Sequence, residues 1–221
     1  MGALSVNTEK VAYWYMRLNG FLQIEDFYIH PSRKGSAQTD ADLLGVRFPH
    51  RAERLIDDPN DVMVDDLENL NLSDHYVDVV IAEVKAGACA LNGPWTNQER
   101  QNVQRVLAAI GCLPHEQIND AANAIYERGC FEQNDLLRIR MIAIGREENP
   151  EVGERYPEVK QVIWTDVLCF IFDRFSRYSN QKSQTDNWDE TGKALKTMAT
   201  KADREGYVKW GIKAMGIRTA N

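Results

Sequence analysis

The sequence predicts an α/β protein in which a mixed central sheet is flanked by helices. Three observations indicate this fold class. An amphipathic helix precedes three strand-like segments, and the third of these, Val77–Ala86, is apolar on both faces, as expected for a central, covered strand. Helical and strand-like segments then alternate. With 221 residues, of which 43% are hydrophobic, the chain is long enough to bury such a core.

The N-terminal part is predicted to form one helix and two strands. Apolar residues recur at helical spacing within residues 7–19. Phe21–Ile29 is strand-like, and a polar turn, Pro31–Gly35, separates it from a second strand, Thr39–Phe48.

Residues 50–76 differ in character from the strands on either side. They contain eight acidic residues and two arginines, and Pro59 lies inside the segment. We expect an acidic insertion with a short helix near Val64–Leu70, mobile or poorly packed against the sheet. Such an insertion suits a lid, a partner surface or a brake on nucleic acid, and a solvated insertion with no role is an equal alternative.

The second half is expected to contribute more helices than strands. Thr96 and Glu99 match a capping box, which predicts a helix over 96–110. The further predicted elements are a helix at 115–128, a strand at Leu136–Ile144, a charged loop at 146–158, a short strand at Gln161–Trp164, a helix from Thr165 or Asp166 through Tyr178, and helical turns at 189–202.

Charge and cysteine content restrict the function class. The net charge of −7 and the pI near 5.2 argue against a passive nucleic-acid coat protein but not against an enzyme with a local basic patch. The four cysteines form no C-x-x-C pair and the four histidines are dispersed, so a structural zinc site is not expected. Free thiols, no signal peptide and no apolar run long enough for a membrane span indicate a cytoplasmic protein.

The residues most informative about chemistry lie in two of the predicted strands. Asp42 lies early in the second strand, and Glu83 and Lys85 lie at i and i+2 in the third, so both point to the same face. Two carboxylates beside an ammonium suit a hard cation and metal-assisted hydrolysis of a phosphodiester. If both carboxylates bind one Mg²⁺, they should lie about 4 to 6 Å apart.

This pattern resembles the PD-(D/E)xK nuclease superfamily, whose core is a helix, three strands, a helix and a strand. The family carries an acid on the second strand and Glu-x-Lys on the third; here TDADLLGV and AEVKAG match these motifs. The chain is most similar in style to archaeal Holliday-junction resolvases, which have a glutamate in the first helix before a Gly-aromatic pair. Glu9 and Gly20-Phe21 match that spacing, and the turn SRKGSAQTDAD is similar to theirs.

The resemblance implies a restriction-endonuclease-like core and a set of residue roles. Asp42 and Glu83 would bind Mg²⁺, which Mn²⁺ can replace, and Lys85 would orient or deprotonate the attacking water. Glu9 would hold a metal-bound water or support a second metal ion. Asp40, two residues before Asp42 and on the same face, is the alternative ligand or a supporting group.

Two groups of residues are candidate nucleic-acid contacts. Arg33 and Lys34 lie in the turn before Asp42 and could bind phosphates. Gln98, Gln101 and Arg105 fall at i, i+3 and i+7 of the predicted 96–110 helix, which puts them on one face. In the family, a polar residue of this helix often approaches the site.

The resemblance covers residues 7–146, which gives two expected domains. Residues 1–146 would form the nuclease core, with the insertion at 50–76, and residues 147–221 a mainly helical extension packed on it. The expected function is a metal-dependent nuclease, with DNA as the expected partner. A catalytically silent nucleic-acid-binding or assembly module and a paired-carboxylate glycosidase remain alternatives. The substrate form and the oligomeric state, including a homodimer, stay open.

Overall fold

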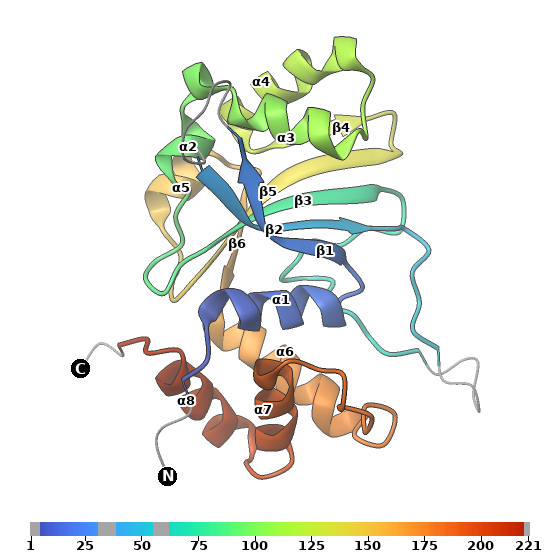
Figure 1. The fold of residues 1–221 in the computed structure, drawn as a ribbon, viewed down its shortest axis with the longest axis vertical. Coiled ribbons are helices and arrows are strands. Elements are labelled where there is room, and N and C mark those ends of the chain that lie inside the picture. The colour runs from blue at the N-terminus through green and yellow to red at the C-terminus, as the bar shows by residue number, and fades with distance from the viewer. Residues whose placement is uncertain (1–4, 31–38, 55–61, 219–221) are drawn as a thin grey trace.

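A computed structural model describes residues 5–30, 39–54 and 62–218. It confirms an α/β protein with a mixed six-stranded sheet flanked by helices (Figure 1). The strands are β1 (Leu22–Ile29), β2 (Thr39–Arg47), β3 (Val77–Val84), β4 (Cys130–Gln133), β5 (Leu137–Gly145) and β6 (Lys160–Ile163). No helix in these ranges is long and apolar enough to cross a membrane.

The strand order brings β3 and β5 together at the centre of the sheet. The order is β1-β2-β3-β5-β4; β1, β2 and β3 are antiparallel neighbours, and β3 and β5 are parallel. Two strands share the outer edge of β5. β4 pairs with its first half, Leu137–Arg140, and β6 with its second half, Ile142–Gly145.

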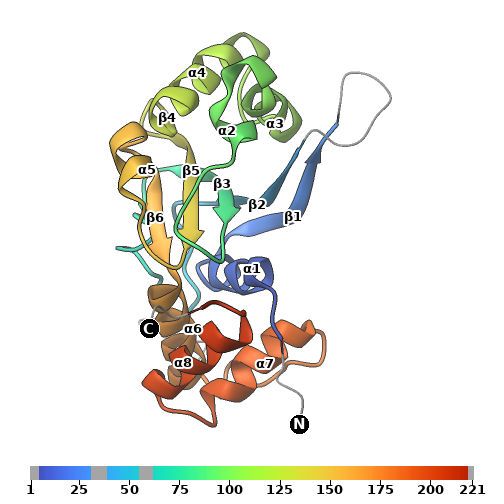
Figure 2. The same cartoon turned by 90° about the vertical axis from the view of Figure 1, so that its left-hand side faces the viewer.

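Helices cover both faces of the sheet (Figure 2). One face packs on α1 (Thr8–Leu18) and α6 (Trp164–Arg177), and the other on α3 (Asn102–Ile110) and α4 (Ile118–Arg128). The remaining helices are α2 (Gly93–Thr96), α5 (Pro150–Arg155), α7 (Glu190–Ala199) and α8 (Arg204–Ala214). In β3, alternation sends Val80, Ala82 and Val84 toward α1 and α6, and Val79 and Ile81 toward α3 and α4.

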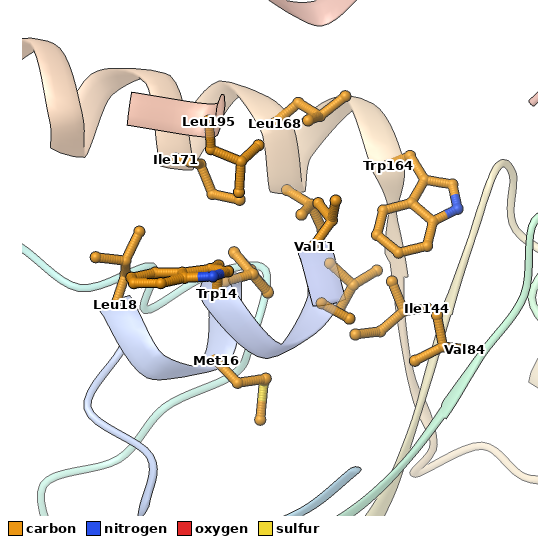
Figure 3. Close-up of a cluster of buried hydrophobic side chains, with 14 of the residues drawn as sticks. Val11, Trp14, Met16, Leu18, Val84, Ile144, Trp164, Leu168, Ile171 and Leu195 are labelled. Carbon is orange, nitrogen blue, oxygen red and sulfur yellow. The ribbon is translucent and has the colours of Figure 1, made fainter. Parts of the chain in front are cut away.

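The core on the α1 face includes the C-terminal helices. Figure 3 shows Trp14 and Val11 of α1 beside Leu168 and Ile171 of α6 and Leu195 of α7. Trp14 lies so close to Gly192 that a Cβ added there would approach its ring to 2.1 Å. The part of the chain after residue 146 thus contributes β6 to the sheet and three helices to the same core as α1.

The predicted helix at 96–110 is wrong in its first half. The segment forms α2, a 3₁₀ turn at Gln98–Arg100 and then α3, because Gln101 adopts a left-handed conformation with φ 54°. The capping box does not form; Asn97, not Thr96, accepts the N–H of Glu99. Three further elements, β4, α5 and α8, were not predicted from the sequence.

The insertion is anchored where the structure describes it, contrary to our expectation of poor packing. Leu70 is fully buried, and the Asp65 carboxylate pairs with Arg47, Arg51 and Arg174. Arginines from β2 and α6 therefore neutralise Asp65 and hold this part of the insertion against the sheet. The expected helix at Val64–Leu70 is a turn.

Candidate active site

Strand pairing brings Asp42 and Glu83 opposite each other. β2 and β3 are antiparallel, and Leu43 of β2 lies across from Ala82 of β3. Asp42 of β2 and Glu83 of β3 therefore form the next pair of facing positions. The Oδ2 atom of Asp42 accepts the backbone N–H of Val84 at 2.6 Å. This bond fixes the Asp42 carboxylate at the end of β3, where Glu83 lies.

Lys85 continues the β3 ladder just beyond the strand. Its backbone N–H donates to Ile144 at 2.8 Å, and its carbonyl accepts the indole N–H of Trp164 at 2.9 Å. The Lys85 Nζ atom lies 2.5 Å from Glu83 Oε1 and 3.8 Å from Asp42 Oδ2. Asp42 Oδ2 and Glu83 Oε1 cannot lie farther apart than the sum of these two distances. Their separation is therefore compatible with two carboxylates that share one ion.

Glu83 is the most buried of the three side chains, with 2% of its surface exposed. Its Oε1 atom also accepts the Asn92 side-chain amide, and the Trp95 indole N–H lies nearby without completing a hydrogen bond. Burial raises the pKa of Glu83 to about 7; the Lys85 hydrogen bond opposes the rise, and the Asp42 charge adds to it. Both ionised and neutral Glu83 are therefore accessible near neutral pH.

Further carboxylates surround Asp42. Burial raises the pKa of Asp42, while the Val84 N–H and Lys85 oppose the rise, and Asp40 and Asp26 add to it. Burial also raises the pKa of Glu9, and the negative charge of Asp42 raises it further. The structure thus brings Glu9, Asp40, Asp42, Glu83 and Lys85 into one electrostatic neighbourhood.

Asp26, Asn92 and Trp95 were not predicted as members of this neighbourhood. Asp26 lies in β1 between the pairs Glu25–Leu43 and Phe27–Ala41, so it faces Asp42, and its φ is 50°. An aspartate tolerates this left-handed conformation better than most residues. No local pattern marks the three residues, because their positions depend on strand pairing and on the path of the loop after β3.

The donor set suits a Mg²⁺ ion that keeps most of its waters. Within the described ranges, Asp42 Oδ1 and Glu83 Oε2 accept no protein hydrogen bond, so each carboxylate keeps one free oxygen. In the same ranges, no three His, Cys, Asp or Glu side chains are grouped to hold a metal ion. Mg²⁺ needs only one or two protein carboxylates, and waters and phosphate oxygens complete its shell.

The structure does not bring the nucleic-acid contacts predicted for the 96–110 segment together on one helix face. Gln98, Gln101 and Arg105 do not share a helix face, because the chain is not helical through Gln101. Gln98 is exposed and donates to Asn123 at 2.7 Å, whereas Arg105 lies within α3. Arg33 and Lys34 lie outside the described residues. All five contacts stay predictions.

Comparisons of the chain with known protein families, with curated proteins and with solved structures found no match.

Proposed function

We propose that this protein is a metal-dependent phosphodiester hydrolase, and specifically a DNA endonuclease. One observation carries the proposal: the carboxylates of Asp42 and Glu83 share the ammonium of Lys85 at the adjoining ends of β2 and β3. Carboxylates suit a hard cation, and a neighbouring ammonium suits the negative charge that grows on a phosphate under attack.

The order of elements supports a restriction-endonuclease-like core. The chain runs α1, β1, β2, β3, then α3 and α4, and then β5 beside β3. This order is compatible with the helix, three strands, helix and strand of the PD-(D/E)xK nucleases. The extra hairpin strand β4 and the insertion before β3 are additions to that order.

Each residue of the site would have a separate role in the reaction. A bound Mg²⁺ supplies Lewis acidity at the phosphate and a water of lowered pKa. Asp42 and ionised Glu83 provide the binding charge, and Asn92 and the Val84 N–H hold the two carboxylates in position. Lys85 orients the attacking water and stabilises the charge on the phosphate. Glu9 and Asp26 add negative potential that attracts a cation.

A cleavage assay with matched variants tests the proposal. Wild-type protein is incubated with single-stranded, duplex and branched DNA and with RNA, in Mg²⁺, Mn²⁺ or a chelator. We expect cleavage of DNA that needs the metal and that Asp42→Asn and Lys85→Ala each reduce at least about 100-fold. Asp173→Asn and Lys209→Ala, which change exposed surface pairs, are the controls and should leave cleavage intact.

Two alternatives correspond to different results of the same assay. Metal-dependent binding of nucleic acid without cleavage would favour the catalytically silent binding module. The paired-carboxylate glycosidase is favoured by one observation, the Glu83 pKa near 7, since a general acid must hold its proton near neutral pH. Chelator-resistant hydrolysis of glycosides that Glu83→Gln abolishes would support it over the nuclease.

A further inference from the structure

A second charged cluster lies at the opposite end of β3. Asp78 near the start of β3 pairs in register with Arg138 of β5, and Arg140 follows on the same face of β5. All three are buried, with 2%, 5% and 2% of their surfaces exposed. By strand alternation they face the α1 side of the sheet, whereas Glu83 faces the α3 side.

Asp78 is saturated by the two arginines. Its Oδ1 accepts the Nε atoms of Arg138 and Arg140 at 3.1 and 3.0 Å, and its Oδ2 accepts their Nη2 atoms at 2.9 and 2.7 Å. Arg138 Nη2 also donates to the Asn71 carbonyl at 2.7 Å. In the described part of the chain, neither Nη1 atom donates to a protein acceptor. Two buried cations therefore share one anion and keep unused donors.

A cavity of about 440 Å³ lies over this cluster. It forms where β4 and β6 divide the edge of β5, and its lining residues are Asn71, Cys130, Glu132, Arg138, Arg140, Pro157, Glu158, Val159 and Lys160. Lys160 adds a third cation. Of the two rim acids, Glu158 pairs with Arg128, whereas Glu132 accepts the neutral Tyr76 hydroxyl and keeps its charge across from Arg138. With Arg128 included, four cations (Arg128, Arg138, Arg140 and Lys160) face three anions (Asp78, Glu132 and Glu158).

We propose that this cavity binds a phosphate group, either free or at the end of a small organic molecule. In the described part of the chain, the Nη1 atom of each arginine and the second N–H of Arg140 Nη2 remain for phosphate oxygens, so Arg140 can offer two parallel N–H bonds. An anion here would balance a cationic pair that Asp78 alone does not balance. The volume lies in the range of small-molecule sites. The cavity is separate from the candidate active site, because Asp78 and Glu83 are about 16 Å apart along β3 and face opposite sides.

Calorimetry in the presence of a chelator tests the proposal independently of the nuclease hypothesis. Inorganic phosphate, a nucleoside 5′-monophosphate and the parent nucleoside are titrated at constant ionic strength set with chloride. We expect binding of either phosphate-bearing ligand and none of the nucleoside. Binding of the monophosphate alone would identify the organic phosphate as the ligand, and binding of phosphate alone would identify the free ion. Absence of binding by both phosphate-bearing ligands, or equal binding of the nucleoside, would overturn the proposal.

Two substitutions at the rim, one that removes a positive charge and one that removes a negative charge, test whether phosphate binds in this cavity. Lys160→Ala removes a cation from the rim and should weaken phosphate binding several-fold, whereas Glu158→Gln removes an anion and should tighten it. Both positions are partly exposed, so the fold should persist. Lys193→Ala on α7 and Glu83→Gln in the candidate active site should leave the affinity unchanged. If Lys160→Ala and Glu158→Gln shift the affinity no more than Lys193→Ala does, phosphate binds elsewhere and the proposal fails.

Discussion

The two ends of β3 hold charge clusters of opposite composition. At the C-terminal end, two carboxylates, Asp42 and Glu83, share the single ammonium of Lys85. At the N-terminal end, two guanidiniums, Arg138 and Arg140, share the single carboxylate of Asp78. Both clusters are built on β3, which contributes Glu83 at one end and Asp78 at the other.

The two clusters differ in how many bonds the single opposite charge, Asp78 or Lys85, makes to the other two groups. Asp78 accepts four hydrogen bonds, and although burial lowers the pKa of Arg138, its bonds to Asp78 outweigh burial and raise that pKa. Lys85 leaves one oxygen of each carboxylate free, and burial raises the pKa of both acids. An excess of buried carboxylate suits a cation, and an excess of guanidinium suits an anion. Replacement of an acid by its amide should therefore destabilise the protein at the Asp78 end and stabilise the metal-free protein at the Glu83 end.

Asp78→Asn should produce the largest effect. The substitution leaves two buried guanidiniums without a counter-charge, and removal of one partner of a buried ion pair costs about 3–5 kcal/mol. Urea denaturation measures the loss in the free energy of unfolding. Asp173→Asn, which breaks an exposed pair with Arg204, is the matched control and should cost no more than about 1 kcal/mol. Equal costs for the two variants would contradict the proposed difference.

Glu83→Gln should stabilise the metal-free protein near pH 8. The folded-state pKa of about 7 exceeds the ordinary value of 4.5, so the native state binds more protons between these values and loses stability as pH rises through them. The shift corresponds to about 3 kcal/mol, and loss of the Lys85 partner reduces the expected gain to about 2 kcal/mol. Below pH 4.5 the gain should vanish.

Urea denaturation of the wild type and Glu83→Gln at several pH values measures this gain. The exposed Glu190→Gln is the control and should show no such pH dependence. A Glu83→Gln variant that is less stable than wild type at pH 8 would show that Glu83 contributes more through Lys85 than burial costs it.

Manganese should stabilise the wild type and much less the Asp42→Asn variant. At a metal concentration 100-fold above Kd, mass action adds about 2.7 kcal/mol to the free energy of unfolding. The side-chain amide introduced by Asp42→Asn would keep an oxygen for the Val84 N–H but lose the ligand charge. Thermal denaturation with and without Mn²⁺ measures the difference. Equal shifts in both proteins would place the metal outside this site.

The sequence predicted the strands that carry both clusters because their patterns are strong. β2, β3 and β5 lie within two residues of their expected bounds, since apolar runs bounded by turns indicate buried strands. β4 and α5 were missed because they are short, and α8 because Gly206 and Gly211 weaken its helical pattern. The break at Gln101 was missed because a left-handed non-glycine residue has no reliable local signal.

The two clusters differed in how far the sequence predicted them. Alternation along a strand was enough to bring Glu83 and Lys85 together, and antiparallel pairing then brings in Asp42. The Asp78 cluster depends on β5 lying parallel to β3 in a particular register, which no local pattern specifies. Asp26 likewise depends on the register of β1 and β2. Local periodicity predicts which face a side chain points to, but only tertiary pairing decides which charges meet.

Asp26→Asn should produce the smallest effect, opposite in sign to that of Asp78→Asn. Asp26 is exposed, and its charge raises the pKa values of Glu9 and Asp42. Asparagine tolerates the left-handed conformation equally well, so the substitution changes charge alone. We expect the metal-free protein to gain about 0.3 kcal/mol at low salt, typical of an exposed charge interaction, and to lose the gain at high salt because ions screen it. Urea denaturation at two salt concentrations measures the gain. A destabilised Asp26→Asn would mean that the carboxylate cluster is not in excess, and that the two ends of β3 are more alike than their composition indicates.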